Sequence, residues 1–231
     1  MDPVFASLGS FFQYTAELMP ALMQGAVTTI QIFVLTLVLA LPLGIPLSLG
    51  SMSKFPPLKI LCKTYIWLFR GTPLILQLFF FYFFIPIIFP SIMLNAYTTA
   101  IITFVLNYTA YFAEIYRGGI ESIDIGQHEA ARSLGLSKSR TMMDIIIPQT
   151  IKRVLPPVSN EAITLIKDTA LVSVISVGEL LKAANGAVNR DSNPTAFLIA
   201  AVIYLFFTFL LTLLSSYLEK RFSRHLTEGV R

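Results

Sequence analysis

Three stretches of this 231-residue chain contain no charged residue, and their lengths decide its fold class. They cover residues 18–53, 71–113 and 192–218, which is 36, 43 and 27 residues. A helix needs about 20 apolar residues to cross a bilayer, because the hydrocarbon core is about 30 Å thick and each residue rises 1.5 Å. The stretches therefore predict an all-α membrane protein, with the lipid bilayer as its main solvent.

The overall composition excludes most other classes of protein. Hydrophobic residues make up 55% of the chain and charged residues only 13%, about half the share found in a soluble domain. A single cysteine, Cys62, excludes a disulfide scaffold. The 17 basic residues are scattered among apolar runs, so no continuous face for nucleic acid is predicted. His128 and His225 lack further ligands at metal-binding spacing, and neither a metal site nor a cofactor is expected.

The apolar stretches divide into five predicted transmembrane helices. The second stretch is long enough for two, and the cluster from Pro86 to Pro90 supplies the break between them. A further candidate begins at Val154 and is apolar except for three charged residues. Residues 2–20 are expected to form a short amphipathic segment at the membrane interface. The five spans, in one transmembrane domain over residues 1–231, are predicted at 22–50, 62–85, 97–117, 154–178 and 195–218.

Basic residues alternate between consecutive loops, and this alternation orients the chain in the membrane. The N-terminal segment and the second loop have none, whereas the first loop has three. The long loop 117–153 has six, and the tail has four, including Arg224 and Arg231. The fourth loop has two, which are offset by two acidic residues. Because basic loops stay in the cytoplasm, the N-terminus is predicted outside and the C-terminus inside.

The predicted cytoplasmic loop 117–153 is the one sizeable hydrophilic segment of the sequence. Ser122 or Asp124 can accept the first amide hydrogens of a short helix, which Gly135 then ends. Ser137 can cap a second helix. Connections in helical bundles usually take about 2–8 residues, far fewer than this loop has. We therefore expect the loop to bind a cytoplasmic partner.

The same loop carries a pattern that resembles a known family. Glu129-Ala130-Ala131 is followed after three residues by Gly135, and after nine more by Ile145-x-Ile147-Pro148. This resembles the E-A-A-x3-G-x9-I-x-L-P loop of permease subunits of bacterial ABC importers, with Ile147 in place of leucine. Four blocks resemble the polar amino-acid subfamily: FRGTPL at 69–74, AEIYRGGI at 113–120, GQHEAARSLGL at 126–136 and IKDTALVS at 166–173.

The resemblance implies a bundle like that of type I ABC importer permeases, located in the bacterial inner membrane. It also implies three partners: cytoplasmic ATP-binding cassette subunits, a second permease subunit that is identical or homologous, and an extracytoplasmic amino-acid-binding protein. The sequence contains no G-x-x-x-x-G-K-[ST] phosphate loop, so a non-catalytic subunit is expected, with ATP hydrolysed by a partner. The resemblance places ATPase coupling at Glu129, Ala130, Ala131, Leu134 and Gly135.

Two predicted spans carry polar residues at helical spacing, although such residues are costly in lipid and tend to face a bundle interior or a water path. The third span carries Thr103, Asn107, Tyr111 and Glu114, with Tyr108 beside them. The fourth span carries Asn160, Glu161, Thr164, Lys167 and Asp168. If the two rows face one another, they line a polar path for substrate.

An amino acid offers an ammonium, a carboxylate and a side chain to such a path. Glu161 is expected to bind the ammonium or a cationic side chain. Asn107, Asn160 and Thr164 are expected to orient the rest by hydrogen bonds, and Tyr108 or Tyr111 to cover it. For Lys167 and Asp168, an ion pair that holds the bundle together is an equally good interpretation.

Two further charged positions are interpreted as structural. Arg70 lies just before Pro73, where a proline kink frees carbonyl groups that the guanidinium could bond. Glu114 and Arg117, three residues apart, are expected to form a pair at the end of the third span.

Two other functions stay open on sequence alone. One is an ABC permease for another small solute, such as a peptide or a metal. The other is an ion-coupled secondary transporter or channel that uses Glu161 and Asp168 as ion ligands. An odd number of spans disfavours the second, because many secondary transporters are built from complete inverted repeats.

Overall fold

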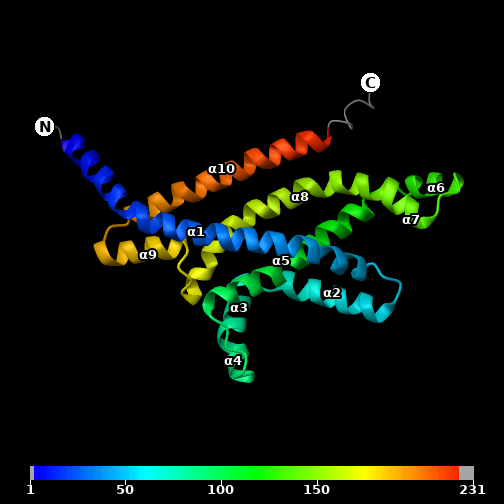
Figure 1. Cartoon of the computed structure of the whole chain (residues 1–231), viewed down its shortest axis with the longest axis horizontal. Coiled ribbons are helices and arrows are strands. Elements are labelled where there is room, and N and C mark those ends of the chain that lie inside the picture. The colour runs from blue at the N-terminus through cyan, green and yellow to red at the C-terminus, as the bar shows by residue number, and fades with distance from the viewer. Residues whose placement is uncertain (1–2, 224–231) are drawn as a thin grey trace. The chain divides into compact units, whose positions relative to one another are not determined.

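The computed structural model describes residues 3–223, and these form helices and connecting turns without a strand in the described range (Figure 1). The predicted all-α fold is confirmed. Arg224, His225 and Arg231 lie outside the described residues. The chain forms two compact units. The first combines the residues up to Leu35 with Leu74–Thr103 and Thr164–Phe209, and the second combines Thr36–Pro73, Phe104–Ile163 and the residues from Leu210 onward.

The first helix, α1 (Pro3–Ser51), is longer than the predicted span. Residues 3–20, which fall in the segment 2–20 expected at the membrane interface, are part of the same helix, and their place at the interface stays a prediction. Leu18 and Leu22 explain the continuity. They lie one helical turn apart, and both are buried in the same apolar cluster, so packing holds the helix together across this region.

The single helix expected over 62–85 is wrong. Helix α2 (Pro56–Gly71) ends before Thr72, which is extended with φ −116° and ψ 143°. Proline disfavours helical backbone in the residue before it and has no N–H to continue the ladder, so Pro73 breaks the helix here. The chain then continues as α3 (Leu74–Phe79), a π-helical turn η1 (Phe80–Phe84) and α4 (Ile85–Ile88).

The remaining predicted spans all fall on helices. Residues 97–117 lie in α5 (Ala96–Glu121), and 195–218 lie in α10 (Thr195–Ser223). Residues 154–178 lie in α8 (Ile147–Asp168), the 3-10 segment η3 (Thr169–Ile175) and the turn after it. Helix α9 (Leu180–Asp191) forms where only a loop was expected.

Length and apolarity separate these helices into two groups. Within the described residues, the main part of α1 and α10 are each long and apolar enough to cross a membrane alone. The pair formed by α2 and the helices after Pro73 makes a third candidate if it counts as one broken span. Helices α5 and α8, which carry the polar rows, do not meet this standard of length and apolarity. The total of five spans therefore stays a prediction.

The helix caps predicted in the long loop are confirmed. Helix α6 (Ile125–Ser133) begins after Asp124, whose carboxylate accepts the Gly126 N–H at 2.6 Å. Gly135 follows its end with φ +73°, a left-handed conformation that favours glycine. The Ser137 hydroxyl accepts the Arg140 N–H and caps α7 (Lys138–Arg140), which leads through the π-helical η2 (Thr141–Ile146) into α8.

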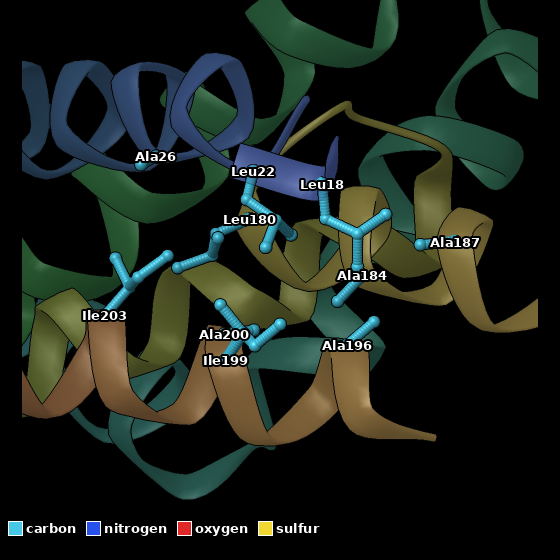
Figure 2. Close-up of a cluster of buried hydrophobic side chains, with 10 residues drawn as sticks. All are labelled: Leu18, Leu22, Ala26, Leu180, Ala184, Ala187, Ala196, Ile199, Ala200 and Ile203. Atoms are coloured by element: carbon cyan, nitrogen blue, oxygen red, sulfur yellow. The ribbon is translucent and has the colours of Figure 1, made fainter. Parts of the chain in front are cut away.

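The core of the first unit is made by α1, α9 and α10 (Figure 2). Small side chains let these helices approach closely, as in other membrane bundles. The approach is tightest at Gly25, where an added Cβ would lie 2.9 Å from the Glu179 carbonyl and from the Leu180 Cα. The buried members are Leu18, Leu22, Ala26, Leu180, Ala184, Ala187, Ala196, Ile199, Ala200 and Ile203.

Replacing Gly25 by alanine is expected to lower the thermal unfolding temperature in detergent, since the new Cβ must displace backbone. Overpacking of this kind costs about 1–3 kcal/mol. Gly186 in α9 is the matched control, because a Cβ there meets nothing within 4 Å. Its alanine variant is expected to be at least as stable as the wild type. Equal unfolding temperatures for the two variants would contradict the close contact at Gly25.

Candidate functional site: the α6 surface and the polar rows

The residues expected to couple to an ATPase lie on α6 and the turn that ends it. Glu129 and Ala130 are exposed, and Leu134 is 78% exposed. Ala131 is instead 1% exposed and packs inward. Ile125 and Met143 of the same loop are exposed as well, and a group of exposed apolar side chains is typical of a surface that a partner covers.

Hydrogen bonds fix the shape of this surface. Gly135 N–H donates to the Arg132 carbonyl and Leu136 N–H to the Ala131 carbonyl, both at 3.0 Å. This pair of bonds satisfies the last carbonyls of a helix that ends in a left-handed glycine. Gln149 on α8 donates to the Gln127 side chain at 3.2 Å and so ties α6 to α8.

Helices α5 and α8 meet closely beside that surface. A Cβ on Gly119 of α5 would clash with Val154 and would approach Thr150 Cγ2 at 3.3 Å. Just beyond it, the Arg153 guanidinium donates to the Ser122 carbonyl at 2.5 Å. Glycine at position 119 thus lets the two helices that carry the polar rows touch near the α6 surface, within the second unit.

The third-span residue Asn107 has a structural bond. Its side-chain amide donates to the Phe69 carbonyl at 3.0 Å. That carbonyl would ordinarily accept the N–H of residue 73, which proline lacks. We expected Arg70 to bond a carbonyl freed by Pro73. The bond to this carbonyl comes from Asn107 instead. Tyr65 adds a second link from α2 to α5, donating to the Leu106 carbonyl at 2.8 Å.

Arg70 contacts α5 through its charge. Its guanidinium lies 3.5 Å from the Glu114 carboxylate and 5.4 Å from the centre of the Tyr111 ring. The predicted pair of Glu114 and Arg117 is confirmed, with two bonds at 2.9 and 2.6 Å, and Arg117 also bonds Glu121. Glu114 therefore joins a basic residue of α2 to one of its own helix.

The other predicted path residues lie in different surroundings. Tyr108 is 1% exposed and packs among the rings of Phe104 and Phe112. In the α8 row, Glu161, Thr164 and Asp168 are half-buried, whereas Asn160 and Lys167 are exposed. The row runs across both units, with Asn160 and Glu161 in the second and the others in the first.

The sequence did not single out Glu179, which is fully buried. Its carboxylate accepts N–H groups from Leu181 at 2.7 Å and Lys182 at 2.6 Å, and the Tyr204 hydroxyl at 2.8 Å. Leu180 N–H donates to Thr29 Oγ1 at 3.2 Å. Burial raises the pKa of the Glu179 carboxyl, while the three donors favour its charged form. Glutamate is not a typical N-cap residue, and Tyr204 is 25 residues away, so no local pattern predicts this cluster.

Comparisons with known proteins place the chain among transport proteins. Residues 37–224 match the family described as binding-protein-dependent transport system inner membrane component. An arginine transport system permease protein of Bacillus subtilis is 36% identical over 91% of this chain and 96% of its own length. An L-cystine transport system permease protein of the same organism is 36% identical over 90% and 89%.

Solved structures show the same relation. A crystal structure of an amino acid ABC transporter with histidines matches at a TM-score of 0.86 and 34% identity, covering 91% of this chain and 98% of that chain. An inward-facing methionine ABC transporter matches at a TM-score of 0.71 and 17% identity, which shows a shared fold. The resemblance predicted from the sequence motifs is confirmed. The chain belongs to the family of binding-protein-dependent transport system inner membrane components and has the fold of a type I ABC permease.

Proposed function

We propose that this chain is the translocation subunit of an ATP-driven importer of polar amino acids. One observation carries the proposal: the chain matches amino-acid permeases over about nine-tenths of its length, including those named for arginine and L-cystine. The solved amino acid transporter at 34% identity supports the same substrate class. The cargo is a cationic or zwitterionic amino acid, since acidic residues outnumber basic ones in the polar positions of the spans.

The substrate path runs between the polar rows of α5 and α8. Glu161 binds the ammonium or a cationic side chain, and Asn160 and Thr164 orient the rest. Tyr111 supplies a ring at the edge of the path, where Arg70 already contacts it. Asn107 and Tyr108 form part of the wall of the path. Asn107 bonds the α2 backbone, and the Tyr108 side chain is buried. Lys167 and Asp168 lie at the extracytoplasmic end of the α8 row.

Helix α6 couples this chain to ATP binding and hydrolysis in the partner subunits. The cytoplasmic ATP-binding subunits contact Glu129, Ala130, Leu134 and the turn at Gly135, and Ala131 seats the helix against its own subunit. The close contact of α5 and α8 at Gly119 passes the movement to the polar rows. A bundle of five spans, with the N-terminus outside and the C-terminus inside, is too thin to enclose a pathway. A second permease subunit completes it, and an extracytoplasmic binding protein delivers the amino acid.

Reconstitution with the ATP-binding subunits and the binding protein is expected to give ATP-dependent uptake into proteoliposomes. A panel of amino acids should include at least one cationic or zwitterionic substrate that stimulates ATP hydrolysis. Uptake by this chain alone, driven by an ion gradient without ATP, would support a secondary transporter instead. Stimulation by a peptide or a metal, and by no amino acid, would overturn the substrate class.

Replacing Glu161 by glutamine is expected to weaken the apparent affinity for substrate by about tenfold or more, because a bond to a charged group is worth roughly 1.5–3 kcal/mol. The loss should be larger for a cationic amino acid than for a neutral one. Glu17→Gln, at an exposed position of α1, is the matched control and should leave uptake unchanged. Normal uptake by the Glu161 variant would show that this carboxylate does not contact substrate.

A further inference from the structure

A cavity opens between α6 and the start of the helical run that leads into α8. Its volume is 570 Å³, within the range of about 300–1,000 Å³ that is typical of ligand clefts. The walls include His128 and Arg132 from α6, Lys138 from α7 and Met142 from η2. All of these residues belong to the second unit, and Figure 1 shows α6 and α7 together at one end of α8.

The cavity is basic and its charges are uncompensated. Its lining holds one guanidinium, one ammonium and one imidazole but no carboxylate. Within residues 3–223, neither Arg132 nor Lys138 forms an ion pair. The hydroxyl of Thr141 in the same wall already donates to the Ser137 carbonyl at 3.0 Å. The charged groups left to meet a ligand, Arg132 and Lys138, are both cationic, which favours an anionic ligand.

Apolar side chains surround this basic cavity. Leu136 and Met142 contribute to its lining, while Leu134 is 78% and Met143 62% exposed on the neighbouring surface. A free phosphate needs no such apolar surroundings. Exposed apolar side chains next to charged ones are instead typical of a surface that binds a protein segment.

We propose that this cavity receives an acidic segment of the ATP-binding subunit, with a carboxylate paired to Arg132 and Lys138. The inference rests on the proposed function and adds a second contact to it. Helix α6 presents Glu129 and Leu134 outward to the ATPase, and the cavity behind it accepts a side chain from the ATPase in return. In one contact the permease inserts side chains into the ATPase, and in the other the ATPase inserts a side chain into the permease. Together the two contacts would fix both the position and the rotation of α6 on its partner.

The test measures binding of the labelled ATP-binding subunit to the full permease in nanodiscs. Lys138→Glu and Arg132→Glu are each expected to raise the dissociation constant by about tenfold or more, because they place like charges face to face. Arg140→Glu is the matched control. It makes the same charge change on the same helix at an exposed position that does not line the cavity, and it should change the constant by less than about twofold.

Two further measurements separate the outcomes. Lys138→Arg should bind like the wild type, and raising the salt concentration should weaken wild-type binding more than binding of Lys138→Glu. If the wild type binds and Lys138→Glu binds equally well, the cavity proposal is wrong while the proposed function stands. If the wild type does not bind the ATP-binding subunit at all, the proposed function itself fails. If the variants lose affinity only in nanodiscs that contain phosphatidylglycerol, the ligand is a lipid and the proposal is overturned.

Discussion

Buried backbone groups have no water to bond, so an interruption of a buried helical run must be satisfied from within the protein. Two such repairs stand out in the described part of the chain. At the end of α2, the Asn107 amide donates to the Phe69 carbonyl that Pro73 leaves without a donor. At the start of α9, the Glu179 carboxylate accepts the first N–H groups of the helix. Each repair brings a side chain from a neighbouring segment to the site of the break.

The same repairs join the helices to one another. Asn107 links α5 to α2, and the contact of Arg70 with Glu114 strengthens that link. Glu179 links α9 to α10 through Tyr204. A polar residue in a membrane helix can therefore serve the backbone, the packing or the substrate, and sequence spacing alone does not separate these roles. This is why the α8 row, with Glu161, carries more of the proposed substrate contact than the α5 row does.

Features that depend on neighbouring residues were predictable from sequence. The caps at Asp124 and Ser137 and the stop at Gly135 follow from local chemistry, and the structure contains all three. The same rules predict a helix break at Thr72–Pro73. The long apolar run around these residues favoured a single span over 62–85 instead, and the break was missed. The pairing of Arg70 with Glu114, 44 positions apart in the chain, depends on how α2 and α5 pack, and no sequence spacing encodes it.

The local origin of the α6 surface has a consequence for binding. Because the bonds at Gly135 and Leu136 fix the end of α6 without help from distant segments, the surface keeps its shape whichever way the spans move. Association with a partner then orders few groups, and little of the binding free energy is lost to conformational entropy. Any movement of α6 would instead pass to α8 through the Gln127–Gln149 bond. The Arg153–Ser122 bond and the contact at Gly119 would then carry it between α8 and α5. A rigid surface on a few defined contacts suits the coupling to an ATPase that we propose for α6.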